Sequence, residues 1–401
     1  MFFNTLSKAD CCACTACEHI CPTKSITFTS DDEGFLYPSI DKSTCIDCKL
    51  CERVCPVEHP NYNNNSLPET YAALLNDLEE RKKSSSGGVF YSLACWILDQ
   101  GGVVYGATIN SDHIVYHIGI EKKEDLHLLR GSKYVQSDLK QVFVEIKNYL
   151  LKGRLCLFVG TGCQVAGLKS FLRKPYDTLI TADLVCHGVP SQWLFNQHIE
   201  YLEHRYKGHV SDYQFRDNEG WGGCESFNLI DNSGKSKVIR NPTYYLSPYL
   251  YSFMYGMTSR YSCYYCKFAK VPRQGDITLG DFWGISNVFP DLNRRSGVSL
   301  LLLNSEKGKS VFESIKNHLE IRKSTLNDGA KYNENLIRVS TKHIYRDIVY
   351  SKIKNEGYQA VAKTEFRYPK YNYIKAISFF RTAPLFRKLW WFLSSVRQKL
   401  N

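Results

Sequence analysis

With 401 residues, 43% of them hydrophobic, the chain is too long for one small core and is expected to form two or three domains. No apolar run approaches the roughly 18 residues of a membrane-spanning helix, and the N-terminus lacks a signal-peptide pattern, so we expect a cytoplasmic protein. The net charge of +11 is concentrated in residues 361–401, which hold nine lysines and arginines against one glutamate. A nucleic-acid-binding protein would spread its basic side chains over the folded body, so no nucleic-acid partner is expected.

The 16 cysteines indicate metal binding, because cytoplasmic thiols stay reduced and rarely form disulfides. The spacing C-x2-C-x2-C-x3-C-P occurs twice, beginning at Cys11 and at Cys45. Bacterial ferredoxins with two 4Fe-4S clusters use this run, and the fourth cysteine of each run binds the other cluster. The predicted ligands are therefore Cys11, Cys14, Cys17 and Cys55 for one cluster, and Cys45, Cys48, Cys51 and Cys21 for the second. A zinc site, the alternative, does not need eight cysteines in duplicate, and Cys12 falls outside the pattern.

Between the two cysteine runs, residues 25–28 and 35–38 alternate around an Asp-Asp-Glu-Gly turn and predict a hairpin. Residues 59–68 are rich in Asn and Pro and predict a linker. The Ser/Gly loop 84–88 then precedes a predicted helix over 89–98 and a strand over 103–107. Such a loop suits a phosphate group at a helix N-terminus or a plain helix cap, and the spacing leaves both open.

Strand 154–159, a helix over 165–172 and strand 178–185 predict a parallel pair of strands. The loops after both strands then lie at the carboxyl edge of the sheet, where α/β folds bind ligands. These loops hold Cys163 and Cys186, and Cys263 and Cys266 follow downstream as a C-x2-C pair. Four thiols are enough for a third cluster, and buried inert cysteines are the alternative.

Six motifs in this order resemble those of the beta subunits of coenzyme F420 hydrogenase and dehydrogenase, across residues 69–340; they are residues 84–88, 131–137, 160–164, 186–188, 263–266 and 276–284. A two-cluster ferredoxin is a frequent N-terminal attachment in this family. The resemblance implies FAD and a third 4Fe-4S cluster on Cys163, Cys186, Cys263 and Cys266. It also implies electron transfer between the clusters and a substrate at the flavin. Gly162 departs from the family, which usually has proline there, and glycine makes the loop more permissive.

The resemblance further implies that two of the motifs hold the flavin, through Ser84, Ser85, Ser86, Gly87, Gly88, Ser132, Lys133 and Tyr134. Near the ring, Lys133 would stabilise negative charge on the reduced flavin, and His187 would exchange a proton. The alternatives are a surface lysine and a histidine satisfied by its neighbours. Asp281, Trp283 and Arg273 are packing or cofactor residues, and the pattern leaves this open.

The expected fold is a small ferredoxin-like domain (α+β) followed by a larger α/β flavin-binding body. The expected boundaries are a ferredoxin domain at 1–58, a linker at 59–68, the two parts of the body at 69–150 and 151–340, and a basic extension at 341–401. Residues 384–400 have apolar residues at helical spacing with two tryptophans and predict a basic amphipathic helix. That helix suits the inner face of a membrane or docking on the body or a partner subunit.

The leading function is a flavin- and iron–sulfur-dependent oxidoreductase that passes electrons between a redox partner protein or soluble donor, the clusters, FAD and a small-molecule substrate. By the resemblance, coenzyme F420 is one candidate substrate, and surface-polysaccharide metabolism is one candidate setting. Two alternatives remain: an electron-transfer subunit that relays to a separate catalytic partner, and a scaffold whose body has lost its flavin.

Overall fold

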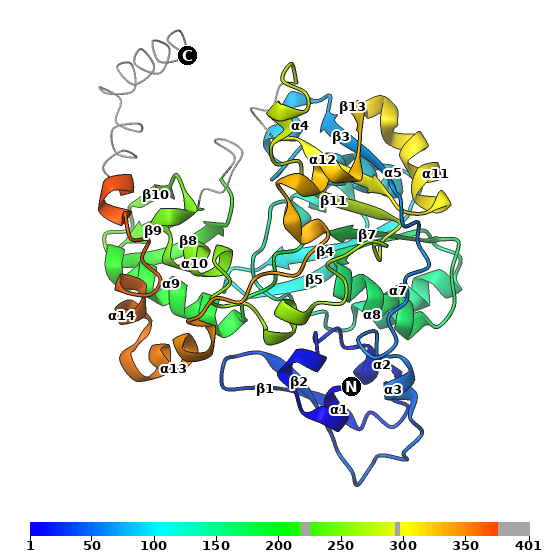
Figure 1. Ribbon diagram of the computed structural model, residues 1–401, viewed down its shortest axis with the longest axis horizontal. Coiled ribbons are helices and arrows are strands. Elements are labelled where there is room, and N and C mark those ends of the chain that lie inside the picture. Colours follow the sequence, from blue (N-terminus) through cyan, green and yellow to red (C-terminus); the bar gives the residue numbers. More distant parts are fainter. Residues whose placement is uncertain (218–224, 293–296, 376–401) are drawn as a thin grey trace.

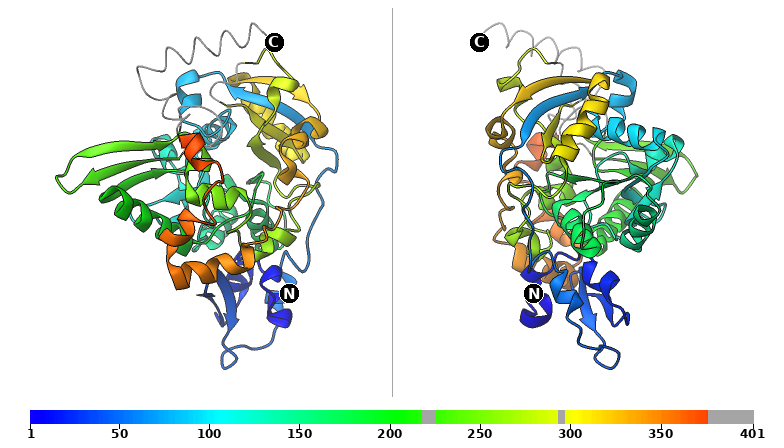
Figure 2. Two further views of the ribbon diagram at one scale, coloured as in Figure 1. Left: turned by 60° about the vertical axis from the view of Figure 1, so that its left-hand side comes forward. Right: turned by 90° about the vertical axis from the view of Figure 1, so that its right-hand side faces the viewer.

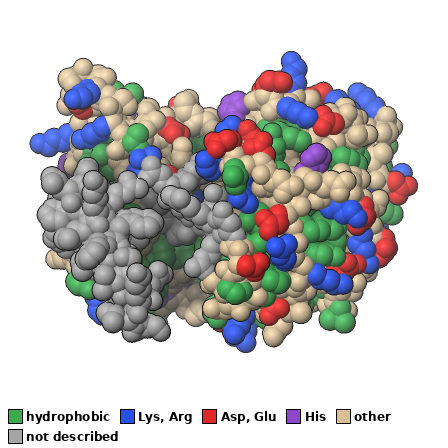
Figure 3. Space-filling view, turned by 90° about the horizontal axis from the view of Figure 1, so that it is seen from above, with side chains coloured by type: hydrophobic (Ala, Val, Ile, Leu, Met, Phe, Trp, Pro, Cys, Tyr) green, Lys and Arg blue, Asp and Glu red, His purple; other side chains and the backbone are tan. Residues whose placement is uncertain are grey.

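The computed structural model describes residues 1–217, 225–292 and 297–375, and shows a mixed α/β protein (Figure 1). The expected C-terminal helix over 384–400 lies outside these residues. Within the described part of the chain, no helix is long and apolar enough to cross a bilayer. On the face seen in Figure 3, lysine and arginine side chains are interspersed with aspartate and glutamate over the described part of the surface.

The N-terminal region lies at one end of the molecule in every view (Figures 1 and 2). Its elements are α1 (Phe2–Thr5), α2 (Ala16–Ile20), β1 (Ile26–Ser30), β2 (Leu36–Ile40) and α3 (Leu50–Arg53). Strands β1 and β2 pair antiparallel with Ile26 opposite Ile40, which confirms the predicted hairpin. The Asp31 carboxylate closes its turn by accepting hydrogen bonds from the backbone N–H groups of Glu33 and Phe35.

An eight-stranded sheet forms the centre of the body, in the order β13-β3-β12-β11-β7-β6-β4-β5. Its strands are β3 (Glu69–Leu75), β4 (Val103–Ile109), β5 (Val115–Ile120), β6 (Cys156–Thr161), β7 (Leu179–Leu184), β11 (Ile277–Asp281), β12 (Ser299–Leu303) and β13 (Leu319–Ser324). Strands β4, β6, β7 and β11 run parallel, which confirms the predicted β6–β7 pair, and the other strands join antiparallel.

Helices cover both faces of this sheet, because its strands are apolar on both sides. Helices α5 and α11 pack on one face, and α7 and α8 pack on the other. Short helices complete this layer at its edges. The body helices are α4 (Leu78–Lys82), α5 (Val89–Asp99), α6 (Leu126–Leu129), α7 (Val142–Leu151), α8 (Gly162–Leu172), α11 (Glu306–Ile315) and α12 (Leu326–Lys331).

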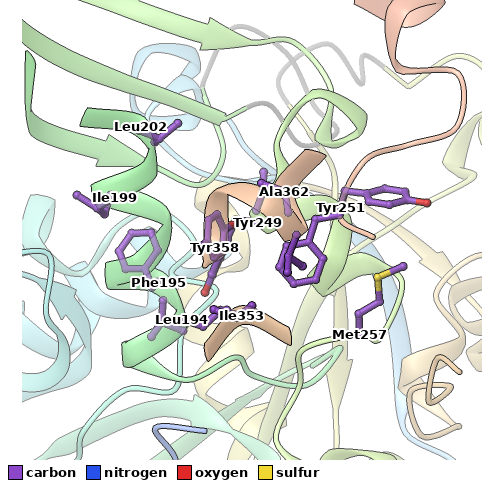
Figure 4. Packing of buried hydrophobic residues seen from close by; sticks show 14 of the residues in the cluster. Leu194, Phe195, Ile199, Leu202, Tyr249, Tyr251, Met257, Ile353, Tyr358 and Ala362 are labelled. Atoms are coloured by element: carbon purple, nitrogen blue, oxygen red, sulfur yellow. The ribbon is translucent and has the colours of Figure 1, made fainter. Parts of the chain in front are cut away.

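A second, three-stranded sheet in the order β10-β9-β8 lies beside the body with four helices (Figure 1). These elements are β8 (Gly208–Gln214), β9 (Glu225–Asp231), β10 (Ser236–Asn241), α9 (Gln192–Tyr206), α10 (Pro248–Met254), α13 (Arg346–Glu356) and α14 (Tyr358–Lys363). An aromatic core joins them, in which Phe195 of α9, Tyr249 of α10 and Tyr358 of α14 are buried together (Figure 4).

The segment predicted as a linker runs along the body and is hydrogen-bonded to it. The Asn64 side-chain amide donates to the backbone oxygens of Arg273 and Gly275, both at 2.8 Å, and the Asn65 N–H donates to the Asn304 oxygen. The asparagines that mark the segment as polar therefore also attach it to the sheet.

Candidate redox centres

The two cysteine runs near the N-terminus fold into the same backbone shape. Ala13 and Thr15 have φ values of 52° and 60°, and the equivalent Asp47 and Lys49 have 52° and 60°. Non-glycine residues seldom adopt this left-handed conformation, so its repetition at matching positions is a property of the loop. Helices α2 and α3 then begin at equivalent residues. The two runs thus repeat one backbone shape, as two cluster-binding loops of equal spacing would.

The first set of predicted ligands, Cys11, Cys14, Cys17 and Cys55, is called here the inner group. Burial raises the pKa of the Cys17 thiol well above its usual value, and the neighbouring thiols of Cys11, Cys55 and Cys51 raise it further. Cys55 thus reaches the first run, although it belongs to the second. The second set, Cys21, Cys45, Cys48 and Cys51, is called the outer group. Cys21 Sγ accepts a hydrogen bond from the Ser25 N–H at 3.3 Å, and its predicted place with the other three stays a prediction.

The two groups differ in burial. Cys11 and Cys14 are 9% and 7% exposed, whereas Cys45 is exposed. Cys14 of the inner group is covered by α8, where a Cβ at Gly167 would lie only 2.6 Å from the Cys14 Cβ. The inner group therefore faces the body, and the outer group faces solvent.

The four downstream cysteines, called here the body group, meet at the carboxyl edge of the large sheet. Cys163 lies in the first turn of α8 after β6, and Cys186 follows β7. Burial raises the pKa of the Cys263 thiol well above its usual value, and Cys186, Cys266 and Cys163 add to this. The parallel strands and the downstream C-x2-C pair thus bring together the four thiols singled out from the sequence.

Hydrogen-bond donors already surround the body-group sulfurs. Cys186 Sγ accepts from the Gly188 N–H at 3.3 Å, and Cys266 Sγ accepts from the Phe268 N–H at 3.4 Å. Cys163 Sγ lies 3.1 Å from the Thr161 hydroxyl. Donors of this kind stabilise the thiolate form that binds iron. No three His, Cys, Asp or Glu side chains in the described ranges lie close enough to hold a single metal ion, whereas a 4Fe-4S cube spreads its ligands over four irons.

Gly162 permits a close approach at the body group. A Cβ at this position would lie 3.1 Å from the Phe268 side chain, which follows Cys266. The turn itself is fixed by a reciprocal capping box between Thr161 and Gln164. The glycine that replaces the family's usual proline is therefore held by its neighbours.

Cys12, which the spacing leaves over, lies between the inner and body groups. Contact with Cys14 is the main cause that raises the pKa of the Cys12 thiol, while contact with Cys163 lowers it. Cys12, Cys55, Cys163 and Cys266 all pack on one apolar cluster at this junction. No sequence signal places Cys12 there, because the junction is made by the docking of two distant segments.

A cavity of about 580 Å³ extends from the body group to the Ser/Gly loop 84–88. All four body cysteines line it, and so do Lys133 and His187. The flavin-site residues predicted by resemblance line it as well, except Gly87. Gly87 packs against the sheet instead, where a Cβ would lie 2.2 Å from the Ala73 oxygen.

The Ser/Gly loop leaves the first turn of α5 without a side-chain cap. The N-cap residue is Gly88, with φ 88°, and its serine neighbours bond elsewhere. Ser85 Oγ accepts from the Ser132 N–H at 2.9 Å, and Ser86 Oγ donates to the Val298 oxygen at 3.0 Å. The loop is thus not a plain side-chain cap, and the helix N-terminus is available to an anion.

Lys133 lies in the cavity wall without a carboxylate partner among the described residues. Its Nζ donates to the backbone oxygens of Arg130 at 2.7 Å and Leu128 at 3.2 Å. Burial lowers the pKa of Lys133 to about 7. Among the cavity-lining residues of the described chain, Asp281 is the only carboxylate, and it accepts a hydrogen bond from Arg216 at 2.6 Å. The wall therefore favours an anionic ligand.

Two histidines also line the cavity. Burial lowers the pKa of His187, and it lowers the pKa of His117 to about 4, so both are neutral at pH 7. His117 Nε2 lies 3.1 Å from the Val159 oxygen, while its buried Nδ1 has no partner within the described structure. His117 was not singled out from the sequence, since a histidine within an alternating strand carries no signal.

The residues left open by the sequence divide between two roles. Asp281 and Trp283 line the cavity, and both contact Arg216, whose guanidinium lies 5.6 Å from the Trp283 ring. Arg273 is buried, pairs with Asp183 at 3.3 Å and does not line this cavity. Arg273 therefore supports the sheet edge, and no phosphate is needed to explain its position.

These features fit the two groups that the resemblance implies. Four neighbouring thiols with N–H donors suit a 4Fe-4S cluster. Within the described chain, a helix N-terminus without a side-chain cap, a lysine without a counter-ion and an imidazole nitrogen without a partner suit a ligand with phosphates and a hydrogen-bonding ring.

Comparison with known proteins gives two family matches. Residues 153–328 match the model of the C-terminal region of the coenzyme F420 hydrogenase/dehydrogenase beta subunit, and residues 10–59 match a 4Fe-4S dicluster domain. A search of curated proteins found no match. Among solved structures, a chain of the F420-reducing [NiFe] hydrogenase complex from Methanosarcina barkeri, in a xenon derivative, is similar at 16% identity. The similarity covers 72% of this chain and 94% of that chain, with a TM-score of 0.43.

Proposed function

Because the C-terminal region of the coenzyme F420 hydrogenase/dehydrogenase beta subunit family is matched behind a 4Fe-4S dicluster domain, we propose that the chain is an iron–sulfur flavoprotein oxidoreductase. It passes electrons between ferredoxin-type clusters and a hydride-accepting substrate at FAD. The observation that carries the proposal is the single cavity that joins the body group to the Ser/Gly loop. A role in surface-polysaccharide metabolism and a cytoplasmic location stay predictions.

The inner, outer and body groups would each hold one 4Fe-4S cluster, which carries one electron at a time. A bound flavin exchanges two electrons with a hydride donor or acceptor and passes them on singly. The burial order supports this assignment, because the exposed outer group faces a redox partner or soluble donor and the inner group contacts the body group through Cys12. With iron bound, the hydrogen bonds from Gly188 and Phe268 would stabilise the Cys186 and Cys266 sulfurs as thiolates.

In the cavity, the residues would act on the ligand through charge and hydrogen bonding. The first turn of α5 and Lys133 would hold negative charge, since Lys133 gains a counter-ion there and its protonated form is favoured. His187, neutral at pH 7, would accept or donate a proton at the edge next to Cys186. Apolar lining residues such as Val159 and Leu279 would exclude water from the reacting atoms.

The test is an anaerobic preparation in which iron, sulfide and released flavin are measured. About twelve irons and one FAD per chain are expected for three 4Fe-4S clusters. The variant Cys263→Ser should lose about four irons, whereas Cys95→Ser, which changes a thiol of α5 that does not line the cavity, should keep all of them. About eight irons without flavin would refute the proposal and favour a scaffold.

A relay subunit is the second candidate, because the matched family is described as a beta subunit of larger enzymes. Assays on the isolated, reconstituted chain distinguish an enzyme from a relay subunit. Reduction of coenzyme F420 or a nicotinamide by this chain alone supports an enzyme. Bound flavin that exchanges electrons only when a partner protein is added supports the relay.

A further inference from the structure

Arg260 is a buried cation, and no anionic side chain among the described residues pairs with it. It is 1% exposed, and its three hydrogen bonds go to neutral acceptors. Nε donates to the Cys11 oxygen at 2.8 Å, Nη2 to the Leu36 oxygen at 2.9 Å, and Nη1 to Gln136 Oε1 at 3.2 Å. No carboxylate of the described residues forms an ion pair with it, in contrast to the equally buried Arg346, which pairs with Glu33.

Neutral acceptors and aromatic rings compensate a buried guanidinium only in part. The Tyr37 and Phe35 rings lie 4.1 and 5.6 Å from the Arg260 guanidinium carbon. Removing a cation from water is costly unless an opposite charge is near. Burial alone would lower the pKa of Arg260, but the neighbouring Cys11, Tyr37, Cys12 and Cys263 raise it. As cluster ligands, Cys11 and Cys263 would carry negative charge beside Arg260, which pairs with no carboxylate among the described residues.

Arg260 also belongs to the segment that carries the body group. Its backbone oxygen accepts from the Cys263 N–H at 2.9 Å, and its N–H donates to the Val189 oxygen at 2.8 Å, in the loop after Cys186. Its guanidinium meanwhile holds the backbone of the inner group. Gln136 completes the link, since its amide accepts from Arg260 and donates to the Cys12 oxygen at 3.1 Å.

We propose that Arg260 is a positioning residue that joins the inner and body groups and serves as their shared counter-charge. The proposal rests on the proposed function, because it requires that iron–sulfur clusters occupy these groups. A cluster becomes more negative by one charge when it accepts an electron from a one-electron donor. A fixed positive charge beside it stabilises the reduced form and raises its reduction potential. No bond forms or breaks at Arg260, and no proton is exchanged.

The test is a redox titration of the anaerobically purified full chain, followed by electron paramagnetic resonance. Arg260→Gln removes the positive charge. Arg260→Lys keeps the positive charge but lacks the planar guanidinium group. Gln136→Glu places a carboxylate against the unchanged arginine. Two midpoint potentials, assigned to the inner and body clusters, should fall in Arg260→Gln and Gln136→Glu and stay near the wild-type values in Arg260→Lys. The third midpoint potential, assigned to the outer cluster, should stay at its wild-type value.

The double variant Glu33→Gln/Arg346→Gln is the matched control, because it removes a buried arginine contact between the same two regions together with its counter-ion. It should leave all three midpoints unchanged. Unshifted midpoints in an iron-loaded Arg260→Gln or Gln136→Glu protein would overturn the proposal. Failure of both variants to load iron, when the control loads it, would also overturn it and leave Arg260 with a structural role only.

Loss of the proposed function gives a different pattern. A wild-type chain with about eight irons and no flavin lacks the body cluster. The inner-cluster midpoint would then still respond to Arg260→Gln if the counter-charge role is correct.

Discussion

The buried ion pair between Glu33 and Arg346 allows a sharp test of how the N-terminal region is docked. Glu33 lies in the β1–β2 turn and Arg346 begins α13, and the pair is bidentate at 2.6 and 2.9 Å. The arginine side chain is 1% exposed and the glutamate 15%. Glu33→Gln leaves the Arg346 charge buried without its partner, and such a change costs about 3–5 kcal/mol.

The neighbouring Asp32 is the matched control. Its carboxylate is 69% exposed and pairs with Lys8 and Lys354 on the surface. Exposed pairs contribute about 0–1 kcal/mol, so Asp32→Asn should change little. Both variants remove one negative charge from the same turn, and only burial differs.

Hydrogen exchange followed by mass spectrometry measures the difference. If docking is lost by local opening, peptides that cover residues 31–40 and 343–356 should exchange together and roughly a hundred- to several thousand-fold faster in Glu33→Gln. The Asp32→Asn protein should exchange within about fivefold of the wild type. Equal protection in the two variants would refute the assignment of the buried pair as a docking contact.

Three further changes test the cavity and the docking surface. Gly167→Ala places a Cβ 2.6 Å from the Cys14 Cβ, so we expect a loss of about 1–3 kcal/mol in thermal unfolding and depletion of the inner-cluster iron; a fully loaded variant with wild-type stability would contradict this contact. In the proposed function, negative charge on the bound flavin would favour protonated Lys133, whose pKa burial lowers to about 7 in the free protein, so flavin affinity should fall as pH rises above 7, by up to about tenfold per pH unit. Lys133→Gln should flatten that profile in a flavin-fluorescence titration, and a wild-type profile that is already flat would exclude the role. Arg130 bonds Glu80 and Ser84 beside the Ser/Gly loop and is 9% exposed, so Arg130→Gln should weaken flavin binding about tenfold, whereas Lys83→Gln, at the exposed side of the same Glu80, should not.

The sequence predicts the parts of the molecule that repeat or alternate. The duplicated cysteine spacing, the hairpin and the β6–α8–β7 unit follow from periodicity and turn residues, and the structure has them within a few residues of the expected positions. The sequence also predicts part of the body group, because parallel strands must place Cys163 and Cys186 at the same edge of the sheet.

Other parts depend on docking between distant segments, which no local pattern encodes. The places of Cys12, Gln136 and Arg260 result from contact between the N-terminal loops and the body. The second sheet and its aromatic core likewise escaped the sequence analysis, since that core joins residues from distant parts of the chain, from β8 to α14. His117 lies on β5, and its imidazole is buried by packing against residues of other strands, such as Phe158.

The unequal burial of the two cysteine runs predicts the order in which their sites lose iron when the protein is exposed to air. Molecular oxygen and chelators reach iron from solvent, and Cys45 is exposed while Cys11 and Cys14 are buried. Damage should therefore proceed in order, with the outer site losing iron first and the inner site surviving behind it. A partly degraded sample would keep its internal redox centres and lose contact with the outside donor, so iron content and donor-dependent turnover would decline at different rates.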